Sequence, residues 1–242
     1  MSIWLPLESN PEVMNTYIGN LGIEDLKVEF TDVFGLNEDL MSMVPRPVKA
    51  FLFVFPINEA TEAQSRALTT AQEDEIKAFK EKHPELFFVK QLIANACGTI
   101  GILHALLNNK DSLGAYSPTS VFGTITNLLT NNSSTPGEEK KKDPMKSLME
   151  VGKQLEKVHQ EAAVLGVTEN QSIDTPINLH FVCFVHVGDR CVELDGRQAD
   201  AILHGVCEDN EAFIRCAAEA MQAKMAMNKG SYEFNITALV EK

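Results

Sequence analysis

Hydrophobic and polar residues alternate along this chain in patterns that separate buried strands from amphipathic helices. A nearly continuous apolar run at 48–55 is enclosed by two prolines and predicts a buried strand. Upstream of it, a helix is predicted over 11–21, with Asn10 as the N-cap and Pro11 at the first helical position. The first third of the chain therefore combines helix and strand.

The next segments also carry clear boundaries. Residues 28–34 predict a short strand, and residues 59–82, rich in Glu, Ala, Gln and Lys, predict exposed helix. That helix should end at His83, because the residue before a proline disfavours helical backbone angles. A further helix is predicted over 97–108, where small and apolar residues follow Cys97.

The middle of the chain gives the weakest signal. Residues 109–135 are rich in Asn, Ser, Thr and Gly around a modest apolar patch at 121–129. A capping-box pattern at 135–138 and the Asp-Pro pair at 143–144 indicate helix starts, and the helix should reach about residue 163. Its predicted buried face consists of Met145, Leu148, Met149, Leu155, Val158 and Ala162.

The last third predicts strand, helix and strand. Apolar segments at 178–187 and 190–196 flank Gly188 and Asp189, the signal of a type II′ hairpin, and a helix at 208–227 precedes a strand at 231–240. Helices in the middle and strands near the end predict an α+β fold around one antiparallel sheet. Length alone allows one large domain or two small ones.

Composition narrows the classes of partner. The net charge is −13, from 21 Lys and Arg against 34 Asp and Glu, which argues against nucleic acid and anionic membranes as partners. The five cysteines are an odd number without a CxxC pair, which indicates a reduced intracellular protein rather than a disulfide framework or zinc site. The N-terminus lacks the pattern of a signal peptide, and we expect the cytoplasm, with the nucleus as a second compartment.

The segment QLIANACGTIG at 91–101 suggests a thiol nucleophile. Cys97 stands at the predicted start of a helix, where the helix dipole favours the reactive thiolate. Gln91 lies just outside that helix, so its side-chain amide could face an oxyanion formed by attack of Cys97 on a carbonyl. We therefore expect Cys97 to be the fast-reacting cysteine.

The predicted hairpin supplies partners for that thiol. If the turn has two residues, His180, His186, Glu193 and Asp195 share one face of the strands. His180 and Asp195 are then diagonal neighbours, and so are His186 and Glu193. Either pair could place a carboxylate on an imidazole that accepts the thiol proton, and strand spacing alone leaves both open.

The blocks NACGTIGILHALLNN, LHFVCFVHV and ELDGR, with WLPLESNPEV at 4–13 and SMVPRPVKAFLFVFPI at 42–57, together resemble the ubiquitin carboxyl-terminal hydrolase family. The match is strong at 4–57, 86–110 and 177–205 and poor between them. Most similar are the short, single-domain members that act on ubiquitin and the related modifier NEDD8. The resemblance implies one catalytic domain over 1–242 with a papain-like core, a central antiparallel sheet flanked by helices and a knotted chain path.

The resemblance also assigns roles to residues. It implies Cys97 as the nucleophile, Gln91 as the oxyanion-hole donor, His180 as the general base and acid, and Asp195 as the residue that orients His180. Glu193 becomes a structural residue. The positions similar to those that meet the ubiquitin tail in this family are Leu7, Glu8, Asp32 and Leu179.

The function implied is a cysteine deubiquitinase that hydrolyses amide or ester bonds at the C-terminal glycine of ubiquitin or NEDD8. It would act as a monomer without a cofactor or metal. A loop over the active site, here at 158–176, would restrict leaving groups to small or unfolded ones. The alternatives are a protein that binds or stabilises monoubiquitin with little turnover, and a general papain-like peptidase.

Overall fold

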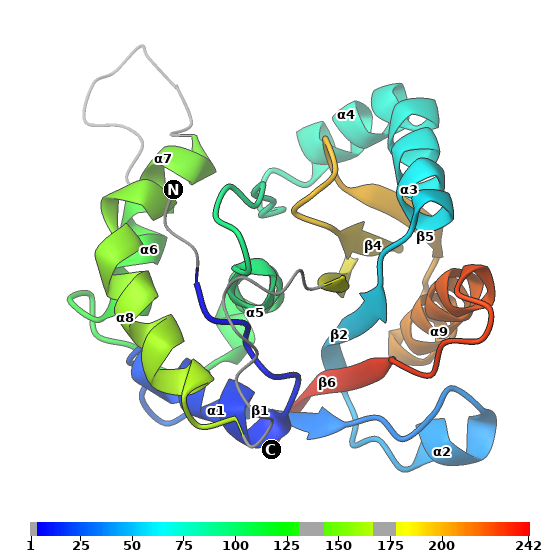
Figure 1. Ribbon diagram of the computed structural model, residues 1–242. Coiled ribbons are helices and arrows are strands. Elements are labelled where there is room, and N and C mark those ends of the chain that lie inside the picture. The colour runs from blue at the N-terminus through cyan, green and yellow to red at the C-terminus, as the bar shows by residue number, and fades with distance from the viewer. Residues whose placement is uncertain (1–3, 131–142, 167–177) are drawn as a thin grey trace.

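A six-stranded antiparallel sheet runs through the molecule in the order β1-β6-β2-β3-β4-β5 (Figure 1). This computed structural model describes residues 4–130, 143–166 and 178–242. The strands are β1 (Val28–Asp32), β2 (Val48–Pro56), β3 (Leu179–Val187), β4 (Arg190–Leu194), β5 (Ile202–Val206) and β6 (Asn235–Glu241). The α+β fold with a central antiparallel sheet is thus confirmed.

Helices cover both faces of this sheet. They are α1 (Pro11–Asn20), α2 (Glu38–Ser42), α3 (Glu59–Ala71), α4 (Glu73–Lys82), α5 (Cys97–Leu107), α6 (Val121–Thr130), α7 (Pro144–Glu150), α8 (Gly152–Ala163) and α9 (Asn210–Met227), with a short 3₁₀ turn at Lys110–Ser112. Helix α5 lies on one side of the sheet with α1, α6, α7 and α8 beyond it, and α9 lies on the other side (Figure 1).

The side chains of strand β2 explain why helices pack on both faces of the sheet. Its side chains alternate between the two faces, because successive residues of a strand point in opposite directions. Ala50 and Leu52 pack in the core under α5, whereas Phe51 and Phe53 pack in the core under α9. A nearly continuous apolar run is therefore what a strand buried on both faces requires.

Several local predictions are confirmed. The side chain of Asn10 accepts a hydrogen bond from the backbone N–H of Glu12 (2.9 Å) and caps α1. Helix α4 ends at Lys82, immediately before His83. The β3–β4 hairpin has the predicted two-residue turn, and Gly188 has the positive φ (59°) that such a turn needs at its first position.

The predicted helix over 59–82 is two helices, and tertiary contacts explain the break at Gln72. The Gln72 side chain donates to the carbonyl of Leu203 (2.7 Å) and accepts from the Leu203 N–H (2.9 Å). It therefore occupies the free edge of β5 as another strand would. The strand β5 itself was not predicted, because a histidine and a glycine interrupt its apolar pattern and its last residue, Val206, is exposed.

The middle segment holds a helix that the sequence did not predict, α6. Its Thr124, Thr126 and Thr130 hydroxyls donate to carbonyls one turn earlier. Threonine has a low intrinsic preference for helix, so packing overrides it here. The helix predicted to reach 163 is broken at Val151, and Met149, predicted to be buried, is 69% exposed.

Two predictions concern segments that are described in part or not at all. The loop expected over 158–176 is wrong for its first part, because α8 continues to Ala163. Residues 167–177, together with the predicted capping box at 135–138, lie outside the described residues. The knotted chain path stays a prediction.

Candidate active site

Cys97 is the first residue of α5, and its thiol is half-buried. Burial raises the pKa of a thiol, but a hydrogen bond with His180, the charge of that imidazole and the N–H groups of Phe181 and Gly98 outweigh burial and lower the pKa of Cys97. The N-terminal end of the helix favours negative charge as well. The thiolate, which is the nucleophilic form, is therefore stabilised at this position.

His180 and Asp195 form the diagonal pair that the hairpin register predicts. The paired residues run from Val187 and Arg190 to Cys183 and Leu194, and the two chains then bring His180 Nε2 to 2.7 Å from Asp195 Oδ1. Both side chains are almost fully buried, 4% and 3% exposed. A short, buried contact of this kind fixes the orientation of the imidazole.

The carboxylate of Asp195 is itself held on several sides. It accepts from the backbone N–H of Arg197 (2.9 Å) and from the side-chain amide of Gln198 (3.3 Å). Burial raises the pKa of Asp195, but His180 and these donors prevail and lower it. Sequence reasoning did not single out Gln198, because its contact with Asp195 depends on the turn after β4, in which the Gln198 N–H donates to the Asp195 carbonyl (3.0 Å).

The imidazole of His180 is held in the charged form. Burial alone would lower the pKa of His180, but hydrogen bonds and charges from Asp195 and the Cys97 thiolate raise it to about 9. Because Asp195 occupies Nε2, Nδ1 is the ring nitrogen that remains for Cys97. Sulfur, imidazole and carboxylate thus come together from α5, β3 and the end of β4.

The alternative pair, His186 and Glu193, is not formed. His186 Nε2 contacts the carbonyl of Cys207 (3.0 Å), and its ring stacks on Phe213. Glu193 is fully buried and pairs with His204 (2.9 Å) and Lys224 (2.8 Å). The two pairs have the same spacing along the strands, but the residues that pack against His186 and Glu193 give these two side chains other partners.

Gln91 lies beside both catalytic segments. Its backbone N–H donates to the carbonyl of Gly196 (2.8 Å), the residue after Asp195. Its side-chain Nε2 donates to the Ile93 carbonyl (3.0 Å), and an amide nitrogen carries a second hydrogen that can donate to an oxyanion. A Cβ on Gly196 would lie only 3.0 Å from the Gln91 nitrogen, so glycine permits this close approach.

The four predicted tail-contact residues lie in different surroundings. Leu7 is 5% exposed and packs on α5, where a Cβ on Gly98 would lie 2.9 Å from it. Leu179 is half-buried and directly precedes His180 in β3. Glu8 accepts from the Asn10 amide (3.2 Å). Asp32 ends β1, and two strands separate β1 from β3. Leu7 and Leu179 therefore adjoin the catalytic residues, and Asp32 lies on a more distant strand.

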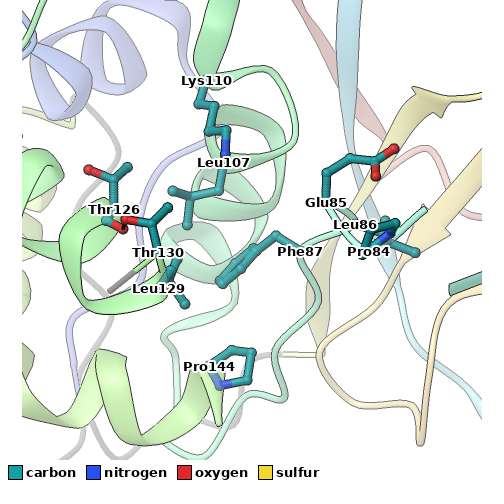
Figure 2. A pocket seen from close by; sticks show the side chains of 10 residues that line it. All are labelled: Pro84, Glu85, Leu86, Phe87, Leu107, Lys110, Thr126, Leu129, Thr130 and Pro144. Carbon is teal, nitrogen blue, oxygen red and sulfur yellow. Dashed lines mark hydrogen bonds between the residues drawn. The ribbon is translucent and has the colours of Figure 1, made fainter. Parts of the chain in front are cut away.

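The pocket shown in Figure 2 is separate from this site. It measures about 380 Å³, and Phe87 and Leu107 line it together with residues from α6 and Pro144. Among the described residues that line it, Glu85 and Lys110 are the charged ones, and none is a cysteine or histidine. Across 4–130, 143–166 and 178–242 no cluster of three metal-ligating side chains is present. The described helices include none with the length and hydrophobicity needed to span a membrane.

This chain is similar to known proteins both in sequence and in fold. The family model described as ubiquitin carboxyl-terminal hydrolase, family 1, matches residues 4–226. A probable ubiquitin carboxyl-terminal hydrolase of Dictyostelium discoideum is 34% identical over 239 residues, which is 99% of this chain and 88% of that protein. Ubiquitin carboxyl-terminal hydrolase 3 of Arabidopsis thaliana is 36% identical over 240 residues, which is 99% and 94% of the two chains.

Human ubiquitin carboxyl-terminal hydrolase isozyme L1 is 31% identical over 234 residues, covering 97% of this chain and 96% of its own. Among solved structures, the UCH37 catalytic domain of Trichinella spiralis bound to ubiquitin vinyl methyl ester superposes with a TM-score of 0.68 at 18% identity. That match covers 100% of this chain and 97% of the other. At this identity the superposition shows a common fold.

Proposed function

The chain belongs to family 1 of the ubiquitin carboxyl-terminal hydrolases, a family of thiol-dependent deubiquitinases, and we propose that Cys97, His180, Asp195 and Gln91 carry out its reaction. The observation that supports this assignment is the convergence of the first three. The His180–Asp195 contact is 2.7 Å, and His180 in turn lowers the pKa of Cys97. This is the geometry of a nucleophile, a base and an orienting carboxylate.

The mechanism follows from those contacts. The Cys97 thiolate attacks the carbonyl carbon of the C-terminal glycine of ubiquitin, and the second Nε2–H of Gln91 and the Cys97 backbone N–H stabilise the oxyanion. The imidazolium of His180 then gives its proton to the departing amine. Water, deprotonated by His180, attacks the thioester, releases ubiquitin and restores the Cys97 thiolate beside the imidazolium. Asp195 keeps the imidazole in place throughout.

We further propose that the ubiquitin tail is read by Leu7, Glu8, Asp32 and Leu179, and that NEDD8 is a second substrate. Leu7 and Leu179 adjoin Cys97 and His180, so they suit the apolar part of a tail that ends at the sulfur. The tail carries arginines, which the carboxylates of Glu8 and Asp32 and the net charge of −13 would attract. Leaving groups would be small or unfolded, and the free cysteines suit a reducing cytoplasm or nucleus.

The proposal is tested with a fluorogenic amide at the C-terminus of ubiquitin and, in parallel, of NEDD8. Native protein should release the fluorophore from ubiquitin, and the Cys97→Ala variant should release none while it still binds ubiquitin. Circular dichroism of the variant shows whether the fold is retained. Undiminished turnover by Cys97→Ala would exclude Cys97 as the nucleophile. Tight binding of ubiquitin by the native protein without turnover would instead indicate a ubiquitin-binding protein.

A further inference from the structure

Three of the five cysteines gather on the face of the sheet opposite α5. Cys191 lies in β4, Cys207 follows β5, and Cys216 lies in α9. The Cys207 N–H donates to the Asp189 carbonyl (2.7 Å), which places Cys207 beside the hairpin turn just before Cys191. Strands β4 and β5 and helix α9 therefore bring together thiols that are well separated in the sequence.

The sulfur atoms of Cys207 and Cys216 lie at the same glycine, Gly205. Interactions with the thiols of Cys191 and Cys207 also contribute to the pKa of Cys216. The Gly205 carbonyl accepts a hydrogen bond from Cys207 Sγ (3.4 Å), and a Cβ on Gly205 would lie 3.2 Å from Cys216 Sγ. A disulfide needs two cysteines whose Cβ atoms are about 4 Å apart, so thiols that meet at one glycine are the candidates for such a bond.

The three thiols differ in access and in charge. Cys191 and Cys207 are buried, 0% and 1% exposed, whereas Cys216 is partly exposed. The hydrogen bond from Cys191 outweighs burial, and with the Gly205 N–H and the nearby His204 it lowers the pKa of Cys216. The same contact and burial raise the pKa of Cys191. The accessible sulfur is thus the thiolate, and its buried neighbours remain thiols.

We propose that Cys216 is a peroxide-reactive site that forms a reversible disulfide with one of the two buried thiols beside it, Cys191 or Cys207. A thiolate that is accessible and lies next to a resolving thiol is the arrangement that supports such chemistry. The site is distinct from the catalytic centre, because Cys97 lies on α5, across the sheet.

The reaction balances with a peroxide as the oxidant. The Cys216 thiolate attacks one peroxide oxygen, the O–O bond breaks, and hydroxide or alkoxide leaves, so that Cys216 becomes a sulfenic acid. The buried thiol loses its proton and attacks the Cys216 sulfur. The S–S bond forms, the S–O bond breaks and water leaves. Two thiols have then lost two electrons, and the peroxide has gained them.

Trypsin separates the cysteines and allows a direct test. Cys191, Cys207 and Cys216 fall in the tryptic peptides 191–197, 198–215 and 216–224, and Cys183 falls in 158–190. The full-length Cys97→Ala variant, which lacks the catalytic thiolate, is treated with hydrogen peroxide, blocked with N-ethylmaleimide under denaturing conditions and digested without reductant. Mass spectrometry then identifies linked and blocked peptides.

We expect peptide 216–224 linked to 191–197 or 198–215, loss of the link after dithiothreitol, and Cys183 blocked throughout. The matched control, Cys216→Ser in the same background, should give no linked peptide and leave Cys191 and Cys207 blocked. Circular dichroism checks that this variant folds. Two results would overturn the proposal. One is Cys216 recovered blocked or over-oxidised without a link, at peroxide levels that inactivate the native Cys97. The other is a Cys191–Cys207 link in the Cys216→Ser control.

Discussion

Replacing Asp195 with asparagine isolates the contribution of one buried charge to the reaction. Asparagine has nearly the same shape, and its Oδ1 can still accept from His180 Nε2 and from the Arg197 N–H, as the Asp195 Oδ1 does. Its NH₂ group would face the Gln198 amide, which can rotate to present its oxygen. The substitution therefore keeps the orientation of His180 and removes the negative charge beside it.

The magnitude follows from the pKa of His180. Burial lowers that pKa, yet Asp195 and the Cys97 thiolate raise it from 6.5 to about 9. This difference corresponds to about 3 kcal/mol of extra stability for the imidazolium, at about 1.4 kcal/mol for each tenfold change in acidity. Loss of most of this stabilisation of the imidazolium should reduce kcat/KM for the ubiquitin fluorogenic amide by roughly 30- to 150-fold.

The pH profile should change in a defined direction. The thiolate–imidazolium pair exists above the lowered pKa of Cys97 and below the raised pKa of His180, and the alkaline limb of activity should therefore lie near 9. Without the Asp195 charge, the pKa of His180 falls, and the alkaline limb should move to lower pH. The acid limb depends on Cys97 beside an imidazolium that is still protonated there, so the active range should narrow from the alkaline side.

The matched control is Asp200→Asn, the same substitution at a partly exposed carboxylate that pairs with Lys80. It should leave kcat/KM and the pH profile close to those of the native protein. If Asp195→Asn gave a profile that superimposed on the native one, or lost no more activity than Asp200→Asn, the charge would not stabilise the imidazolium in the way described.

Three further predictions concern the surroundings of the site. Gln91→Ala should lower kcat by roughly 10²–10³-fold with little change in KM, because an oxyanion donor acts in the transition state; a rise in KM alone would indicate substrate binding instead. Gly196→Ala should cost about 1–3 kcal/mol in urea unfolding and lower kcat, since its Cβ would crowd Gln91; native activity would contradict this. Lys224→Met should cost about 3–5 kcal/mol in urea unfolding, because the buried Glu193 loses the lysine and keeps only His204 as a partner. The double variant with Glu193→Leu should recover most of that loss, and equal instability of both variants would point to lost packing.

The sequence predicted the hairpin correctly because the residues that determine a two-residue turn are adjacent in the chain. Gly188 has φ = 59°, and Asp189 does not share a positive φ, as a type II′ turn requires and a type I′ turn does not allow. A two-residue turn fixes the register of every following pair, and the His180–Asp195 contact follows from that register. Strand spacing alone did not show whether His180 or His186 is the catalytic histidine, because that depends on the position of Cys97, which lies on helix α5.

The elements that the sequence missed depend on distant contacts. The break at Gln72 exists because its side chain pairs with the backbone of Leu203, far along the chain. Helix α6 forms from threonine and glycine because Phe122 and Ile125 are buried against the core. Helix propensity depends only on neighbouring residues and does not include these distant contacts. The tertiary structure therefore overrides it here.

The cysteines show the same limit at the level of chemistry. Sequence reasoning expected Cys97 to be the fast-reacting thiol, and the lowered pKa of Cys97 agrees with that expectation. Cys216 gave no sequence signal, because it lies inside a helical pattern without a neighbouring motif. The contacts that lower its pKa come from Cys191, Gly205 and His204, all on the two strands beside α9. A reactive thiol can therefore be defined by packing alone.

The position of the catalytic sulfur depends on how closely α5 approaches the sheet. Gly101 lies one turn after Cys97, and a Cβ on it would lie 3.2 Å from Leu52 and 3.6 Å from Phe181. Glycine therefore lets the helix pack directly on β2 and β3. The N–H of Phe181 lowers the pKa of Cys97, and the preceding residue, His180, forms the ion pair with it. One helix-to-sheet distance thus sets both interactions of the sulfur, and proton transfer requires that distance to be accurate to a fraction of an ångström.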